Sequence, residues 1–171
     1  TPPVPFTPNT DTLGWTNNKR PSVTFSTIDN ISGISHYQLK INGSGFSTQT
    51  SPFIAPIQSD GMHEIIVRAF DLAGNYIEGS VIIYIDSSAP LVEFINPLDG
   101  VWIKNDSQKI TWLQTDALSG VKNVSIRIDE QEHFDIGLRK SFTIKELSEG
   151  VHSIQLIVFD NASNSITKDY S

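Results

Sequence analysis

The amino-acid sequence predicts an all-β protein made of two tandem antiparallel β-sandwiches. Three observations predict this fold class. The chain repeats itself with a period of 87 to 89 residues, apolar and polar residues alternate in both copies, and Gly, Pro, Asn and Asp separate the alternating segments. A repeat of this length indicates one domain per copy, because solenoid units are only about 20–50 residues long.

The repeat is clearest in "HEIIVRAFDLAGN" at 63–75, which returns as "HSIQLIVFDNASN" at 152–164, an offset of 89 residues. Earlier in each copy, "DNISGI" at 29–34 returns as "DALSGV" at 116–121, an offset of 87 residues. Trp15 likewise matches Trp102. The offset grows by two after "LKING", so we expect a longer loop there in the second copy.

Period-two alternation predicts the strands of both copies in the same order. A strand has this period because successive side chains point to opposite faces of the sheet. The residues predicted to face the core are Val23, Phe25, Tyr37, Leu39, Ile41, Ile65, Val67 and Ala69 in the first copy, and Ile110, Trp112, Val124, Ile126, Ile128, Ile154, Leu156 and Val158 in the second. About seven short strands per copy is typical of a two-sheet sandwich of immunoglobulin type.

The boundary between the copies is predicted at "IDSSAP", 85–90, where a strand ends and Pro90 prevents simple continuation of a ladder. This places one domain at 1–86 and the other at 87–171. Ser171 aligns near Ile82 of the first copy, so we expect the last strand of the second domain to be clipped.

The two motifs resemble those of the immunoglobulin-like (Big-type) domains that repeat in bacterial and archaeal cell-surface and secreted proteins. In that group a D-x-x-S-G-[IV] loop precedes the third strand, and G-x-H, an apolar strand and D-x-A-G-N end each copy. Here these are "DNISGI" and "GMHEIIVRAFDLAGN", then "DALSGV" and "GVHSIQLIVFDNASN". The resemblance covers essentially the whole chain. It implies an extracellular structural, spacer or adhesion module, as in S-layer proteins and adhesins.

The ends of the chain fit a fragment of a larger prokaryotic surface protein. It opens on "TPPVPFTP", without an initiator Met or a signal peptide, and stops at "TKDYS". The expected partners are other domains of the same chain, neighbouring surface proteins or polysaccharide. A further hypothesis is an adhesin that binds protein by pairing edge strands.

Composition excludes several classes of function. With 12 basic and 19 acidic residues, the net charge of −7 argues against nucleic acid and anionic membrane surfaces as partners. The absence of cysteine excludes thiolate zinc sites and a cysteine nucleophile. No apolar run reaches the roughly 18 residues of a membrane span, so we expect no membrane insertion by this segment.

His63 and His152 are the candidates for catalysis. Both share the parity of the inward residues at the mouth of a strand, and both follow the same Gly by two positions. Repetition in both copies favours an architectural role, and no G-x-S-x-G nucleophile motif is present. We therefore expect no enzyme, no catalytic residue and no organic cofactor.

Asp71 with Asn75, and Asp160 with Asn164, flank predicted hairpin turns, where short Asx side chains bond their own backbone. Ser163 replaces Gly74, so we expect the positive-φ position of the second turn to move to Asn164. The alternative is calcium, which takes about six to eight oxygen ligands. The residues expected to contribute to such a site, at the domain junction, are Asp86, Asp116, Asp160 and Asn161.

The alternative function is an accessory carbohydrate-binding module attached to a secreted hydrolase. Such a module needs aromatic residues in a row on one outward surface. The outward candidates are Phe70, Tyr76, Tyr84, Phe159 and Tyr170. Trp112 is expected in the core, whereas Trp15 and Trp102 are expected to cover the open side of each sandwich.

The sequence contains five N-x-[S/T] sequons, four of them in predicted turns or loops and the one at Asn123 at a loop–strand edge. Their acceptors are Asn30, Asn42, Asn105, Asn123 and Asn161. Asn and Ser co-occur in turns for conformational reasons alone, and this is one reading of the sequons. The other is a glycosylated exterior, which is available to archaeal and eukaryotic surface proteins.

Overall fold

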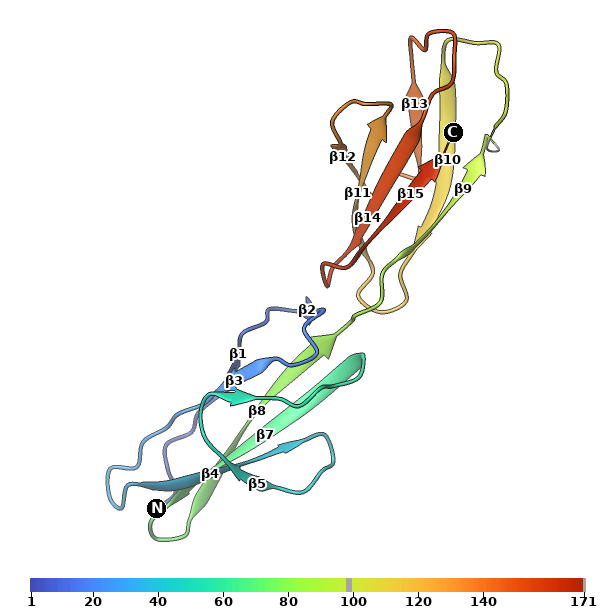
Figure 1. Ribbon diagram of the computed structural model, residues 1–171. Coiled ribbons are helices and arrows are strands. Elements are labelled where there is room, and N and C mark those ends of the chain that lie inside the picture. The colour runs from blue at the N-terminus through green and yellow to red at the C-terminus, as the bar shows by residue number, and fades with distance from the viewer. Residues whose placement is uncertain (98–99, 171) are drawn as a thin grey trace. The chain divides into compact units, whose positions relative to one another are not determined.

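A computed structural model describes residues 1–97 and 100–170 (Figure 1). All regular elements within those ranges are β-strands. The chain divides into two compact units, Thr1–Ser87 and Ser88–Ser171, and each is described by itself. The described residues contain no helix long and apolar enough to cross a membrane.

Unit 1 is a sandwich of two sheets. Its strands are β1 (Asn9–Thr10), β2 (Trp15–Thr16), β3 (Ser22–Thr24), β4 (Ile34–Ile41), β5 (Ser47–Gln49), β6 (Phe53–Ile54), β7 (Gly61–Asp71) and β8 (Tyr76–Ile85). One sheet has the order β1-β3-β6 and the other β2-β8-β7-β4-β5. All pairs are antiparallel except β2 with β8, which is parallel.

Unit 2 repeats this architecture with shorter final strands. Its strands are β9 (Leu91–Asn96), β10 (Gln108–Thr115), β11 (Val121–Ile128), β12 (Phe134–Gly137), β13 (Ser141–Ile144), β14 (Ile154–Asp160) and β15 (Ser165–Tyr170). The sheet orders are β13-β10-β9 and β12-β11-β14-β15, antiparallel throughout. Ser171, where the sequence predicts a clipped final strand, lies outside the described residues.

Each unit buries its own apolar core between its sheets. The core residues of unit 1 are Val23, Phe25, Leu39, Ile65, Val67, Ile83 and Ile85, and those of unit 2 are Ile110, Trp112, Val124, Ile126, Ile136, Ile144, Ile154, Leu156 and Val158. Every residue predicted to face inward is buried or packs against these clusters; Ala69 is buried but belongs to neither cluster. The predicted fold class, two β-sandwiches of immunoglobulin type, is confirmed.

The two poles of each sandwich carry different motifs. We call the pole with the D-x-x-S-G loop and the β7–β8 or β14–β15 turn the motif pole. Loop and turn are joined there, because Leu72 N donates to Gly33 O at 3.1 Å and Asn161 N donates to Gly120 O at 3.0 Å. We call the other pole the histidine pole, since His63 or His152 lies there.

One sequence prediction about the motif pole is wrong. Ser163 itself has a positive φ of 72°, close to the 86° of Gly74, so the left-handed position does not move to Asn164. The reason is that Asn164 N must donate to the carboxylate of Asp160, at 2.7 Å, as Asn75 N does to Asp71. The turn therefore keeps its geometry and places the strain on Ser163.

Candidate functional site

The D-x-x-S-G loop of each unit is built around its aspartate. Asp29 Oδ1 accepts hydrogen bonds from the backbone N–H groups of Ile31, Ser32 and Gly33, at 3.0, 2.6 and 3.0 Å. These donors, the Ser32 amide first, lower the pKa of Asp29. Asp116 holds its own loop in the same way, with Gly120 N at 2.6 Å. The motif is thus explained as a carboxylate-organised turn.

The turn aspartates of the motif pole are buried. Asp71 accepts from Asn75 Nδ2 at 2.7 Å and from Asn75 N at 2.8 Å. The bond from the Asn75 side chain lowers the pKa of Asp71, against the opposite effect of burial. Asp160 accepts from Asn164 in the same two ways, both at 2.7 Å. Both copies therefore use the D-x-A-x-N residues to close a hairpin.

Two of the predicted calcium ligands approach each other within unit 2. Asp116 and Asp160 offer carboxylate oxygens within 4.8 Å of one another. Asn161 ties the turn to the loop, because its Nδ2 donates to Ser119 O at 2.8 Å and to Gly120 O at 3.1 Å. Asp86 belongs to unit 1, where its N–H donates to Thr16 O at 2.9 Å. Calcium binding by these residues stays a prediction.

Both ring nitrogens of His63 form hydrogen bonds at the histidine pole of unit 1. Its Nε2 donates to Ser59 O at 2.8 Å, and Asn42 Nδ2 donates to its Nδ1 at 3.2 Å. The Asn42 carboxamide is oriented by Glu64 N, which donates to its Oδ1 at 3.1 Å. Because an amide nitrogen can only donate, Nδ1 accepts from Asn42, and Nε2 carries the hydrogen that is donated to Ser59 O.

His152 has the same place in unit 2 but a different partner. Its Nε2 donates to Ser148 O at 2.9 Å, and its Nδ1 donates to Asp129 Oδ2 at 2.8 Å. The Asp129 carboxylate, followed by the Ser148 carbonyl, raises the pKa of His152 above its usual 6.5. Burial acts to raise the pKa of Asp129, but the bonds from His152 and Ser153 N lower it on balance.

An aromatic row crosses the outer face of the five-stranded sheet in unit 1. His36, Phe70 and Tyr76 stand directly opposite one another on β4, β7 and β8. The His36 and Phe70 rings stack at 4.7 Å, and Phe70 and Tyr76 lie at 5.2 Å. Arg68 extends the row, since its guanidinium lies 3.7 Å from the Phe46 ring centre and bonds Glu78 at 2.6 Å.

The prediction that Tyr170 faces outward is wrong. Tyr170 stands opposite the buried Ile154, so it shares the inward parity of that residue. Its ring lies 4.6 Å from that of Phe94 against the core of unit 2, and its hydroxyl donates to Pro97 O. Tyr84, another of the predicted outward aromatic residues, lies against Trp15, with ring centres 5.4 Å apart.

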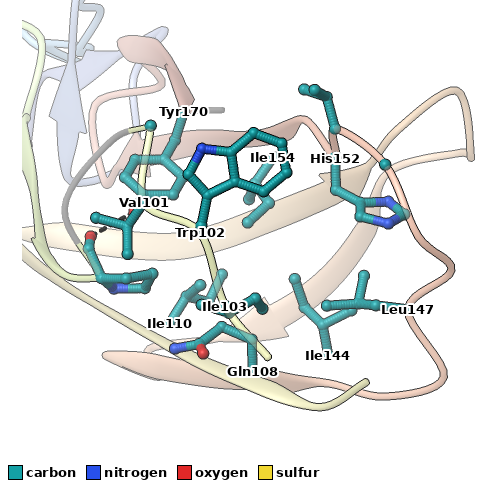
Figure 2. Close-up of a pocket in the computed structure, with 14 residues that line it drawn as sticks. Val101, Trp102, Ile103, Gln108, Ile110, Ile144, Leu147, His152, Ile154 and Tyr170 are labelled. Atoms are coloured by element: carbon teal, nitrogen blue, oxygen red, sulfur yellow. Dashed lines mark hydrogen bonds between the residues drawn. The ribbon is translucent and has the colours of Figure 1, made fainter. Parts of the chain in front are cut away.

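The prediction that Trp102 covers its sandwich is also wrong. The Trp102 side chain is 92% exposed, and it stands at the rim of an apolar pocket of about 310 Å³. The pocket opens at the histidine pole of unit 2, between Trp102, Tyr170, Ile154, Ile144 and Leu147 (Figure 2). Sequence reasoning missed this pocket, because its lining comes from segments that are far apart in the chain.

The five sequon asparagines differ in how their side chains are used. Asn42, Asn123 and Asn161 donate from Nδ2, the atom that a glycan would modify, to His63, Asp135 and backbone carbonyls respectively. Asn30 and Asn105 are exposed residues of loops. Asn30 and Asn105 are therefore the better placed acceptors.

No protein-family model matches the chain, and no curated protein matches it. Among solved structures, it is similar to the fibronectin(III)-like modules of Clostridium thermocellum CbhA. The identity is 18% and the TM-score 0.53, over 95% of this chain and 90% of that chain. Since the identity is this low, the similarity shows the fold alone. It supports an immunoglobulin-like all-β fold and leaves membership of the Big-type family a prediction.

Two weaker similarities carry no argument about this chain. One is to dimeric latent PorU of Porphyromonas gingivalis, with 14% identity and a TM-score of 0.43, over 99% of this chain and 20% of that chain. The other is to SGBP-B of a Bacteroides ovatus mixed-linkage glucan utilization locus, solved with a heptasaccharide. There the identity is 9% and the TM-score 0.33, over 98% and 70% of the two chains.

Proposed function

We propose that this chain is a non-catalytic spacer or adhesion segment from the extracellular part of a larger prokaryotic surface protein. The observation that carries the proposal is the path of the chain through each unit. Thr1 O accepts a hydrogen bond from Asn75 at the motif pole of unit 1, and the chain leaves after Ile85, opposite Gly61, at the histidine pole. A segment that enters at one pole and leaves at the other spans the length of its own sandwich.

Unit 2 has the same path. Leu91 enters beside Thr115, next to the Asp116 loop, and Tyr170 leaves opposite Ile154. The ten residues of β8 correspond to about 33 Å at 3.3 Å per residue. Each module therefore adds length to a tandem array, as a spacer requires. The polar residues shared by the copies hold loops and turns, which fits an architectural role.

The test is to stretch single molecules of the whole chain by its two ends. We expect two unfolding events, each releasing about 30 nm of chain, the contour of roughly 85 residues at 3.6 Å each. Unit 1 should resist more, because a pull loads its parallel β2–β8 pair along the strands. Trp15→Ala, which removes the contact with Tyr84, should lower the force of one event only. Extension without distinct events would refute a load-bearing spacer.

The second candidate function is polysaccharide binding, and the aromatic row of unit 1 favours it. Tyr76 is 48% exposed and continues the stack of Phe70 and His36, so the row offers ring faces and edges to a sugar. We expect a panel of soluble β- and α-glucans to retard the protein in affinity electrophoresis. Tyr76→Ala should abolish the retardation, whereas the matched control Tyr84→Ala, outside the row, should retain it. If the protein migrates equally far with and without each glucan, this function is eliminated.

A further inference from the structure

The turn that follows β4 in unit 1 has the same shape as the turn that follows β11 in unit 2. In unit 1, Ser44 N donates to Ile41 O at 3.1 Å, and the first central residue of the turn, Asn42, has a φ of 54°. The turn at 128–131 is closed in the same way at 3.2 Å, and its first central residue, Asp129, has a φ of 51°. Asn42 and Asp129 therefore occupy one position of a repeated turn.

The two side chains also bond the same partners. Asn42 Oδ1 accepts from the backbone N–H of the residue after His63 at 3.1 Å, and its Nδ2 donates to His63 Nδ1 at 3.2 Å. Asp129 Oδ1 accepts from the backbone N–H of the residue after His152 at 2.8 Å, and its Oδ2 accepts from His152 Nδ1 at 2.8 Å. Asn42 therefore has an amide nitrogen at the place where Asp129 has a carboxylate oxygen.

The residue after Asn42 favours conversion of that amide into a carboxylate. Asn42 is the one asparagine of the chain that a glycine follows, and both Asn42 and Gly43 are exposed. The backbone nitrogen after an asparagine can attack the side-chain carboxamide carbon, and glycine has no side chain to obstruct the attack. A Cβ added at Gly43 would meet no other atom within 4 Å, so the surroundings of this nitrogen are open.

The backbone of Asn42 has the conformation that ring closure needs. Its φ is positive, whereas Gly43 lies outside the left-handed region, and a positive φ at the first central residue alone defines a type II′ turn. In this turn ψ of the first central residue is about −120°. The Cβ of Asn42 then eclipses Gly43 N about the Cα–C bond, as in a planar five-membered ring. The side chain has only to rotate once its bonds to His63 Nδ1 and Glu64 N open.

We propose that Asn42 is a site of spontaneous deamidation, and that the aspartate formed there adopts the bonds of Asp129. Gly43 N loses its proton to solvent and bonds to Cγ of Asn42, the Cγ–Nδ2 bond breaks, and the side-chain nitrogen leaves as ammonia. Water then adds to Cγ of the resulting succinimide, and the bond from Cγ to Gly43 N breaks. This restores the peptide N–H and leaves a carboxylic acid, so the net change consumes water and releases ammonia.

The aspartate product changes the hydrogen bonding of His63. A carboxylate can only accept, so His63 Nδ1 must carry a hydrogen, as His152 Nδ1 does, while Nε2 keeps its bond to Ser59 O. Deamidation therefore gives unit 1 the aspartate–histidine contact of unit 2. Addition of water to the main-chain carbonyl of the succinimide gives isoaspartate instead, whose longer main chain does not fit the turn.

The first experiment ages the whole chain in mildly alkaline buffer and maps its peptides by mass spectrometry. We expect the peptide with Asn42 to gain the mass difference between a carboxamide and a carboxylic acid severalfold faster than peptides with any other asparagine. The matched control is Gly43→Glu, which introduces the residue that unit 2 has at this turn position and should slow the change severalfold. A faster change at another asparagine, or an equal rate in the control, would overturn the proposal.

The second experiment tests the bonds of the product. Asn42→Asp supplies the aspartate directly, and the aspartate form of the aged protein is separated from its isoaspartate form by chromatography. In neutral buffer, ¹⁵N NMR should show that the ring-nitrogen shifts of His63 move toward those of His152 in both samples, because Nδ1 now carries a hydrogen. Ring shifts of His63 that equal those of the unaltered chain would overturn the proposed contact, whatever the rate of deamidation.

Discussion

His63 and His152 occupy the same position in the two units but form different hydrogen bonds through Nδ1. The ring bonds a backbone carbonyl through Nε2 in both units, at 2.8 and 2.9 Å. The hydrogen-bond partner of Nδ1 differs between the two units. Asn42 donates to it in unit 1, whereas Asp129 accepts from it in unit 2. A carboxylate partner favours the imidazolium and makes unit 2 sensitive to pH.

The first prediction concerns Asp129→Asn. The raised pKa of His152 means that its stabilisation is present below its usual 6.5 and is lost as the pH rises through the folded value. The lowered pKa of Asp129 gives stabilisation above its usual 3.8 that is lost as the pH falls through the folded value. The pair therefore stabilises unit 2 most between about pH 4 and pH 6.5. Thermal unfolding should show that Asp129→Asn lowers the midpoint more at pH 5.5 than at pH 9; equal losses at both would contradict the pairing.

The second prediction concerns the sequons. When the chain is secreted from a eukaryotic host, mass spectrometry of its glycopeptides should find Asn30 and Asn105 occupied more fully than Asn42, Asn123 and Asn161. The reason is that the Nδ2 atoms of the latter three already donate hydrogen bonds. Equal occupancy at all five would show that these bonds offer no protection.

At the scale of elements, the β7–β8 and β14–β15 turns have the same geometry with different residues. Asp71 and Asp160 each receive two bonds from the asparagine four positions later, and this fixes the backbone between them. The third turn residue is then left-handed in both units. Gly74 adopts that conformation freely, whereas Ser163 has a Cβ and is strained at φ 72°.

The third prediction is a reciprocal pair of turn variants. Ser163→Gly should stabilise unit 2 by about 1 kcal/mol, because glycine relieves the left-handed strain. Gly74→Ser should destabilise unit 1 by a similar amount. Chemical denaturation of the whole chain measures both free energies of unfolding, and each unit serves as the internal control for the other. Two changes of the same sign would contradict the assignment of strain to Ser163.

The N-terminal segment is a second element whose place depends on one glycine. A Cβ added at Gly79 on β8 would lie 2.6 Å from Phe6 O and 2.9 Å from Pro8 Cδ. The segment therefore crosses β8 in direct contact with its backbone, and Phe6 reaches the core of unit 1. The equivalent residue of unit 2 is Lys168, which pairs with Leu156 as Gly79 pairs with Val67 and is exposed.

At the scale of the whole molecule, the sequence-based division into domains 1–86 and 87–171 stays a prediction, which separate expression of the two segments would test. The proposed spacer role depends on the same repeat. In each sandwich the chain enters at the motif pole and leaves at the histidine pole. Additional copies of the domain would therefore lengthen an array without changing the fold of each copy.

The fourth prediction concerns calcium at Asp86, Asp116, Asp160 and Asn161. Isothermal titration should show heat of binding, and calcium should raise the unfolding midpoint, because a ligand that binds only the folded state stabilises it. Asp116→Asn and Asp86→Asn should each weaken binding. Asp29→Asn is the matched control, since it alters the equivalent loop of unit 1. Absence of both heat and a shift in the midpoint would exclude the site.

Much of the fold was readable from local pattern. The alternation at Ile65, Val67 and Ala69 and its copy at Ile154, Leu156 and Val158 predicted which side chains enter each core, because strand parity is a local property. The face of Tyr170 cannot be read from local pattern, because the sequence does not show which residue of β14 stands opposite it. Only its pairing with Ile154 shows that it points inward.

Local sequence patterns are sufficient to establish the repeat, the all-β class, the inward residues and the two motifs, because these depend on periodicity and on turn chemistry within a few residues. Only the folded chain shows what the motif residues do. The different partners of His63 and His152, the approach of Asp116 to Asp160, the aromatic row and the open pocket beside Trp102 all depend on contacts between distant segments. Such contacts depend on strand register and on where each strand ends. Neither can be read from the local sequence around the two contacting residues.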